Sequence, residues 1–221
     1  PAPAPKPAAT ANPGAYAFEN TNPDGSPYRW NPCATIHYVT NLHEAPASAA
    51  ADVDQAIRML SSATGIVFQN DGTTSEMPST KRPLDQPTRY GSGHSPLLIA
   101  WARSSETDIY NGDGPNTVGT AQTTWIGPVP TDSSQDATYV TGQVAVETDA
   151  TSSFPAGFGS GRTVGLVLLH ELGHVAGLAH VSDPNQVMYP DLMPVPAAAY
   201  AAGDLSGLKR LGTTAGCLPA R

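Results

Sequence analysis

The stretch HELGHVAGLAH, residues 170–180, contains three of the six histidines of the chain, together with one acid and two glycines. An apolar run precedes it, so we expect a buried helix to continue into it. His170 and His174 are four residues apart and therefore project from the same face of that helix. Gly177 predicts a left-handed helix end, after which the chain can turn back and bring His180 towards the pair.

Three imidazoles in this arrangement form the ligand set of a catalytic zinc ion, which keeps its fourth position for water. Zinc held by three neutral imidazoles lowers the pKa of that water to about 7. Glu171 stands beside the ligands and can accept the proton as a general base. The residues therefore predict one catalytic zinc, with ligands His170, His174 and His180, and amide hydrolysis. The alternative, a chance run of histidines, would bury ionisable side chains on an apolar helix without compensation.

The composition excludes several classes of partner. The 221 residues are 39% apolar, enough for one domain with a core, and carry a net charge of −8. Nucleic acids and anionic membranes need a basic patch, so neither is expected as a partner. The longest apolar run, VGLVLL at 164–169, is far shorter than the roughly 18 to 20 residues that cross a bilayer, so we expect no membrane insertion.

The chain contains two cysteines, Cys33 and Cys217. One disulfide between them would join the two ends of the chain and indicate an oxidising compartment. On the chain-entropy view, so long a loop favours a stabilisation of about 4 to 5 kcal/mol. The alternative is two unrelated buried thiols.

Hydrophobic patterns predict the elements along the chain. Residues 1–15, which begin PAPAPKPAATANP, are rich in Pro and Ala and predict a disordered, polyproline-like tether. The turn-rich stretches at 71–95 and 104–117 are long for loops of a compact domain, which indicates that they are functional or held down. In chain order, the expected elements are a strand at 35–40, an amphipathic helix at 46–65, strands at 66–69, 96–102, 118–125 and 139–148, and the helix from 163.

The 170–180 stretch matches, at every fixed position, the HExxHxxGxxH pattern of the metzincin zinc endopeptidases. Eight residues after the third histidine, VMYP contains Met188, which resembles the methionine turn beneath the zinc of that clan. Alone, Met188 would be an ordinary core residue. Tyr189 follows directly and Pro190 comes second, which resembles the matrixins and differs from the astacins, so no tyrosine ligand is assigned.

The resemblance implies an α/β (α+β) fold, the metzincin catalytic domain. That domain has a twisted, mostly parallel five-stranded sheet with one antiparallel edge strand, two long helices and a small C-terminal lobe with a short helix. We expect residues 16–221 to form it, with an upper lobe to about 177 and a lower lobe over about 178–221. The segment at 201–212 resembles the final helix of the lower lobe.

The resemblance also implies a function: a secreted, extracellular and monomeric zinc metalloendopeptidase that hydrolyses internal bonds of polypeptide substrates. In that clan the substrate binds extended along the edge strand, and one side chain enters a pocket beside the methionine turn. The corresponding residues here are Gly119, Thr120, Ala121, Gln122, Tyr189 and Pro190. A rival hypothesis is a secreted binding or adhesion module that keeps a structural zinc, although such a site has no need of Glu171.

Several features depart from the matrixin pattern. His94 alone does not reproduce the second, structural zinc site of vertebrate matrixins, so we expect one zinc only. Val181 stands where serine or threonine is usual, and a bridge between the chain ends is not general in the family. The likeness is therefore to a divergent branch, such as a bacterial one. DIYNGDG at 108–114 offers Asp108, Asn111 and Asp113 to calcium, but such a cluster is also typical of a plain turn.

Overall fold

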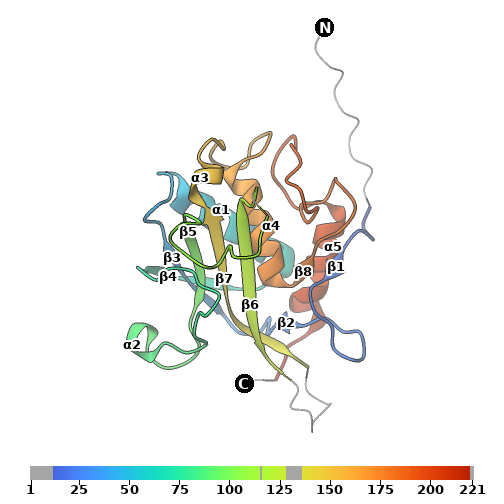
Figure 1. Cartoon of the computed structure of the whole chain (residues 1–221). Coiled ribbons are helices and arrows are strands. Elements are labelled where there is room, and N and C mark those ends of the chain that lie inside the picture. Colours follow the sequence, from blue (N-terminus) through green and yellow to red (C-terminus); the bar gives the residue numbers. More distant parts are fainter. Residues whose placement is uncertain (1–11, 115, 128–135, 220–221) are drawn as a thin grey trace.

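A mixed sheet lies at the centre of the computed structural model, which describes residues 12–114, 116–127 and 136–219 (Figure 1). Its five longer strands lie in the order β4–β3–β5–β7–β6. All neighbours in this order are parallel except β6, which runs antiparallel to β7 at one edge. The bounds are β3 Ile36–Asn41, β4 Phe68–Thr73, β5 Leu97–Ala102, β6 Gly119–Ile126 and β7 Thr138–Glu147.

The predicted sheet, mostly parallel with one antiparallel edge strand, is therefore confirmed. The structure adds a two-residue strand, β2 (Arg29–Trp30), which is parallel to the start of β7. It also adds a separate antiparallel pair, β1 (Ala17–Phe18) with β8 (Leu178–Ala179). These short strands exist because distant segments pair with each other, so their own few residues carry no periodic signal.

Two long helices cover one face of the sheet. They are α1 (Ala49–Thr64) and α4 (Val164–Ala176), which pack against each other, and α4 also contacts β6 and β7. The segment 74–96, with the short helix α2 (Pro87–Tyr90), lies over the opposite face, where Tyr90 packs on Val39, Leu98 and Ala100. Strand β5 is buried over its whole length, because both faces of the sheet are covered.

The C-terminal part holds the short helix expected there. It is α5 (Ala202–Leu211), followed by a 3₁₀ turn at Thr213–Ala215. One further short helix, α3 (Thr148–Thr151), follows β7 directly. Cys33 and Cys217 form a disulfide, which confirms the predicted bridge. Of the expected tether at 1–15, residues 1–11 lie outside the described residues.

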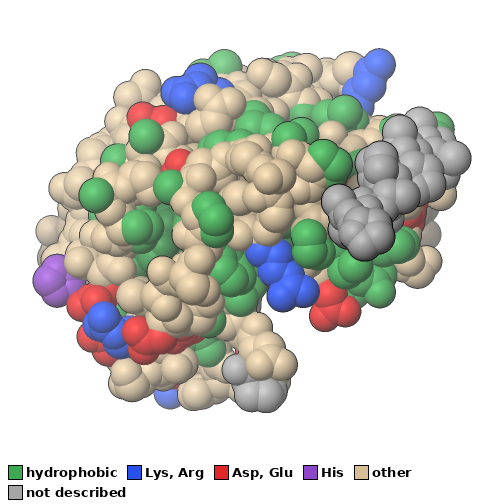
Figure 2. Space-filling view, turned by 90° about the horizontal axis from the view of Figure 1, so that it is seen from above, with side chains coloured by type: hydrophobic (Ala, Val, Ile, Leu, Met, Phe, Trp, Pro, Cys, Tyr) green, Lys and Arg blue, Asp and Glu red, His purple; other side chains and the backbone are tan. Residues whose placement is uncertain are grey.

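One face of the surface shows how the basic side chains are distributed. Figure 2 shows the molecule from above: Lys and Arg side chains lie apart from one another on this face, and the surface is notched along the lower edge of the view. Among the described residues, no helix combines the length and the apolar character that a membrane span requires.

Candidate active site and metal centre

Helix α4 carries two of the three histidines, and its two ends are defined by local interactions. The hydroxyl of Thr163 accepts a hydrogen bond from the backbone N–H of Leu166 (3.2 Å) and caps the first turn. Gly177 ends the helix with a φ of 115°, in the left-handed region that the sequence predicted. A Cβ at this position would lie 3.2 Å from the carbonyl oxygen of Tyr28, so glycine also suits the space. The chain then reverses through β8 and brings His180 beside the helix.

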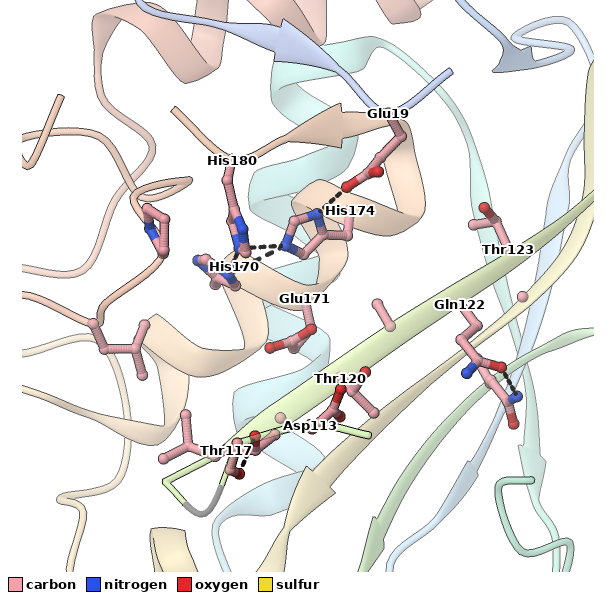
Figure 3. Close-up of a pocket in the computed structure, with 18 of the residues that line it drawn as sticks. Glu19, Asp113, Thr117, Thr120, Gln122, Thr123, His170, Glu171, His174 and His180 are labelled. Atoms are coloured by element: carbon pink, nitrogen blue, oxygen red, sulfur yellow. Dashed lines mark hydrogen bonds and ion pairs between the residues drawn. The ribbon is translucent and has the colours of Figure 1, made fainter. Parts of the chain in front are cut away.

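The Nε2 atoms of the three histidines converge on one point (Figure 3). They are 3.1 Å apart for His170 and His180, 3.2 Å for His170 and His174, and 3.1 Å for His174 and His180. A tetrahedral zinc ion with Zn–N bonds of about 2.0 to 2.1 Å separates its nitrogens by about 3.3 Å, so the three atoms fit around one ion. Within the described part of the chain, no other group of three or more His, Cys, Asp or Glu side chains converges in this way.

The other ring nitrogens show where the protons lie. His170 Nδ1 is 2.7 Å from the carbonyl oxygen of Val187, and His174 Nδ1 is 2.9 Å from that of Leu178. Because a carbonyl only accepts, each of these rings carries its proton on Nδ1. In the neutral rings, the lone pairs on Nε2 therefore point at one another, an arrangement that a cation between them stabilises. The three Nε2 atoms are therefore suitable donors for one metal ion.

Burial and charge determine the protonation of the cluster. Burial, followed by the charge of His174, lowers the pKa of His170 to about 3, and the same two causes lower the pKa of His180. Burial also acts against protonation of His174, but the hydrogen bond to Glu19 and the charge of Glu171 outweigh it and raise its pKa. His170 and His180 therefore present the neutral form that binds metal, while a metal competes with a proton at His174.

Glu171 lies next to these ligands on α4 and faces β6 (Figure 3). It is only 4% exposed, and burial raises the pKa of its carboxyl group to about 7. Strand β6 begins at Gly119, where a Cβ would lie 2.8 Å from Glu171 Oε1. A larger residue at 119 would displace the carboxylate, so this glycine permits the close approach of strand and acid.

Met188, the residue predicted for the methionine turn, packs against Gly173 of helix α4. A Cβ on Gly173 would lie 2.3 Å from its sulfur, so the absent side chain at 173 makes room for it. Met188 is 1% exposed, and its carbonyl oxygen accepts a hydrogen bond from the N–H of Val181. The buried carboxylate of Asp204, on α5, accepts hydrogen bonds from the backbone N–H groups of Val187 (2.8 Å) and Met188 (3.3 Å). Helix α5 thus holds the turn in place.

The histidines and Glu171 lie in a cleft of about 1360 Å³. Residues 119–122 of β6 and Pro190, which were predicted to bind substrate, line this cleft. Tyr189 was predicted there too, but it is half-buried and does not line the cleft, whereas Asp191 and Leu192 do. Strand β6 is hydrogen-bonded to β7 along one edge, and no described strand pairs with its other edge. An unpaired edge of this kind can bind an extended chain.

The residues proposed as calcium ligands make contacts of their own within the protein. The carboxylate of Asp108 accepts hydrogen bonds from the backbone N–H and the hydroxyl of Thr80, and it thereby ties the loop to segment 74–96. The backbone N–H of Asn111 bonds to the carbonyl oxygen of Asp108, and Asp113 lines the cleft. These contacts are those of a turn, and calcium binding at 108–114 stays a prediction.

Sequence reasoning missed two acids that contact the site. Glu19 Oε1 lies 2.9 Å from His174 Nδ1, and Asp204 supports the methionine turn. The hydrogen bond from His174 lowers the pKa of Glu19. Both acids are far along the chain from the residues that they contact, so no local spacing could have identified them.

The comparison with protein families agrees with this geometry. No curated protein matches the chain. The matrixin family model (Peptidase_M10) matches residues 30–211, which include the five longer strands of the central sheet, both long helices and the three histidines. The chain therefore belongs to the matrixin family of zinc-dependent peptidases.

Proposed function

We propose that this matrixin is a secreted endopeptidase that hydrolyses internal bonds of extended polypeptides. The observation that carries the proposal is the set of three Nε2 atoms, 3.1 to 3.2 Å apart, beside the buried carboxylate of Glu171 in an open cleft. Three protein ligands leave one position of a tetrahedral zinc ion free, which a catalytic site needs and a structural site lacks.

His170, His174 and His180 would hold the ion. When bound, zinc lowers the pKa of a water molecule and polarises the carbonyl oxygen of the scissile amide. Glu171 accepts a proton from the attacking water as its oxygen bonds to the carbonyl carbon. The same carboxyl group then donates this proton to the amine nitrogen as the C–N bond breaks. A pKa near 7, caused by burial, suits a group that must both accept and donate.

The free edge of β6 supports an extended binding mode. A substrate strand can add to this edge through backbone hydrogen bonds along residues 119–122, in a cleft that Pro190 also lines. The cleft would then run between an upper lobe that ends at about 177 and a lower lobe over about 178–221 of one domain, 16–221. The disulfide between Cys33 and Cys217 suits an oxidising compartment and supports export.

The test compares wild type with Glu171→Ala on an unfolded protein such as casein, with and without a zinc chelator. We expect wild type to make internal cuts that the chelator abolishes. Glu171→Ala should bind one zinc but cleave at least about a hundredfold more slowly, because it lacks the base. A matched control is Glu106→Ala, which removes a surface acid outside the cleft.

Two outcomes would contradict the proposal. Cleavage at the wild-type rate by Glu171→Ala would remove this residue from the mechanism. Absence of cleavage by zinc-loaded wild type, over a broad set of unfolded proteins, would favour the binding module with a structural zinc.

A further inference from the structure

The N-terminal part of the chain reaches the metal centre through one side chain. Glu19 Oε1 lies 2.9 Å from Nδ1 of His174, 155 residues later in the sequence (Figure 3). The same Nδ1 also lies 2.9 Å from the carbonyl oxygen of Leu178, so the two acceptors share one proton. Glu19 is thus in contact with a ligand and not with the position of the metal.

Backbone pairing fixes where Glu19 lies. Strand β1 pairs with β8, with Phe18 opposite Leu178, and the N–H of Glu19 donates to the carbonyl oxygen of Gly177 (2.9 Å). Gly177 and β8 lead directly from α4 to His180, so the same reversal of the chain positions His180 and the docking site of Glu19. On the other side of Glu19, the amide of Asn20 donates to the hydroxyl of Tyr139 (3.3 Å).

The chemistry of this contact differs from that at the neighbouring ligand. His170 donates its Nδ1 proton to one neutral carbonyl, that of Val187. His174 donates to a carbonyl and also to a carboxylate, which is a stronger acceptor and carries a negative charge. A carboxylate on Nδ1–H holds the ring orientation, places the single proton of the neutral ring on Nδ1 and makes Nε2 a better donor to a cation.

We propose that Glu19 is a positioning residue that orients His174 and raises the affinity of the three-histidine site for zinc. The inference rests on the proposed function, since it assumes that these histidines bind the metal. It makes the N-terminal segment, outside the HExxHxxGxxH stretch and outside the residues matched by the family model, a part of the metal centre.

Zinc affinity of the metal-free protein, measured by competition with a chromophoric chelator, tests this directly. We expect Glu19→Ala to bind zinc about 10- to 100-fold more weakly, the usual effect of losing such a partner. Glu19→Gln should lose clearly less, because its amide oxygen can still accept the Nδ1 proton. The absorption spectrum of the cobalt-substituted protein should also change in Glu19→Ala, since one ligand ring is released.

The control is Asp24→Asn, which removes a charge from the same segment where the carboxylate bonds only within its own turn, to Ser26. Wild-type zinc affinity in Glu19→Ala would overturn the inference, and so would an equal loss in Asp24→Asn or in Glu19→Gln. The urea midpoints of the metal-free variants should equal that of wild type, and a lower midpoint in Glu19→Ala would assign the loss to folding and overturn it too. Failure of wild type itself to bind zinc would instead overturn the proposed function.

Discussion

Glu171, as the proposed general base, must be ionised to accept a proton, whereas burial of its side chain favours the neutral form. Burial raises the pKa of its carboxyl group to about 7, and a cation held by the adjacent histidines lowers it from there. Because a general base works only in its ionised form, kcat/KM should fall as the pH drops below the pKa of Glu171 in the zinc-loaded protein, by about tenfold for each pH unit.

The measurement is kcat/KM on a fluorogenic peptide between about pH 5 and about pH 9, with bound zinc determined at each point. Zinc must be followed because protons compete with the metal at the histidines, above all at His174, whose pKa is raised. If wild type shows this fall while zinc remains bound, Glu171→Gln should lose the pH-dependent part of its residual rate; the same fall in Glu171→Gln would exclude Glu171 as the group that titrates.

At the scale of residues, the sequence predicts those side chains of the site that a single helix turn and a single chain reversal bring together. The three histidines and Glu171 lie within eleven consecutive residues, so helix geometry and Gly177 determine how they meet. Glu19 and Asp204 could not be predicted, since only strand pairing and helix packing bring them to His174 and Met188. Tyr189 was placed at the cleft by resemblance, but the chain turns so that Asp191 and Leu192 line it.

At the scale of elements, the segment 74–96 is fastened by a buried ion pair. Arg82 and Glu76 have side chains only 5% and 7% exposed, and their two hydrogen bonds are 3.0 and 3.1 Å long. Arg82 also donates to the carbonyl oxygens of Pro96 (2.7 Å) and Gly142 (3.0 Å), while Tyr90 donates to Glu76 (2.6 Å). The ion pair therefore links the segment to the start of β5 and to β7, the strand that carries β6.

Breaking this pair should be costly. Arg82→Met leaves the carboxylate of Glu76 buried without its cation, which typically lowers the free energy of unfolding by about 3 to 5 kcal/mol. The double variant Arg82→Met/Glu76→Leu should recover most of that loss, because no unpaired charge remains. Urea unfolding measures both. The control Arg58→Met, whose exposed guanidinium bonds only to Gln55, should change stability by less than about 0.5 kcal/mol. Equal stability of Arg82→Met and wild type would refute the argument.

The elements that the sequence predicted are those with a strong hydrophobic period. Strand β5 and helices α1 and α4 were located because each buries a continuous or regularly spaced set of apolar residues. Strand β4 was expected to end at 69 and continues to Thr73, because its polar, exposed residues pair with β3 at the sheet edge without any apolar alternation. Helices α2 and α3 were not predicted, because each is a single helical turn and is too short to show a hydrophobic period.

At the scale of the whole molecule, the segment 29–33 is tied to the segment 216–218. The disulfide joins residues 184 positions apart, and around it Arg29 donates to the carbonyl oxygen of Gly216 (2.7 Å) while the N–H of Leu218 donates to Asn31 (3.1 Å). The segment between Glu19 and Cys33 therefore connects the metal centre to the C-terminus through β2. The cleft and the disulfide-bonded segments are therefore connected through this segment of the chain.

Removing the bridge should destabilise the fold more than it disturbs the site. A loop of this length restricts the unfolded chain strongly, so the double variant Cys33→Ala/Cys217→Ala should lose about 2 to 5 kcal/mol of unfolding free energy. Urea unfolding of the metal-free forms is the measurement, because bound zinc would add its own stabilisation to both proteins. Below the unfolding transition, zinc affinity should remain that of wild type, since the hydrogen bonds of Arg29 and the pairing of β1 with β8 still hold the N-terminal segment. A loss of zinc affinity in a variant that is still folded would show that the bridge itself, rather than this pairing, keeps Glu19 on His174.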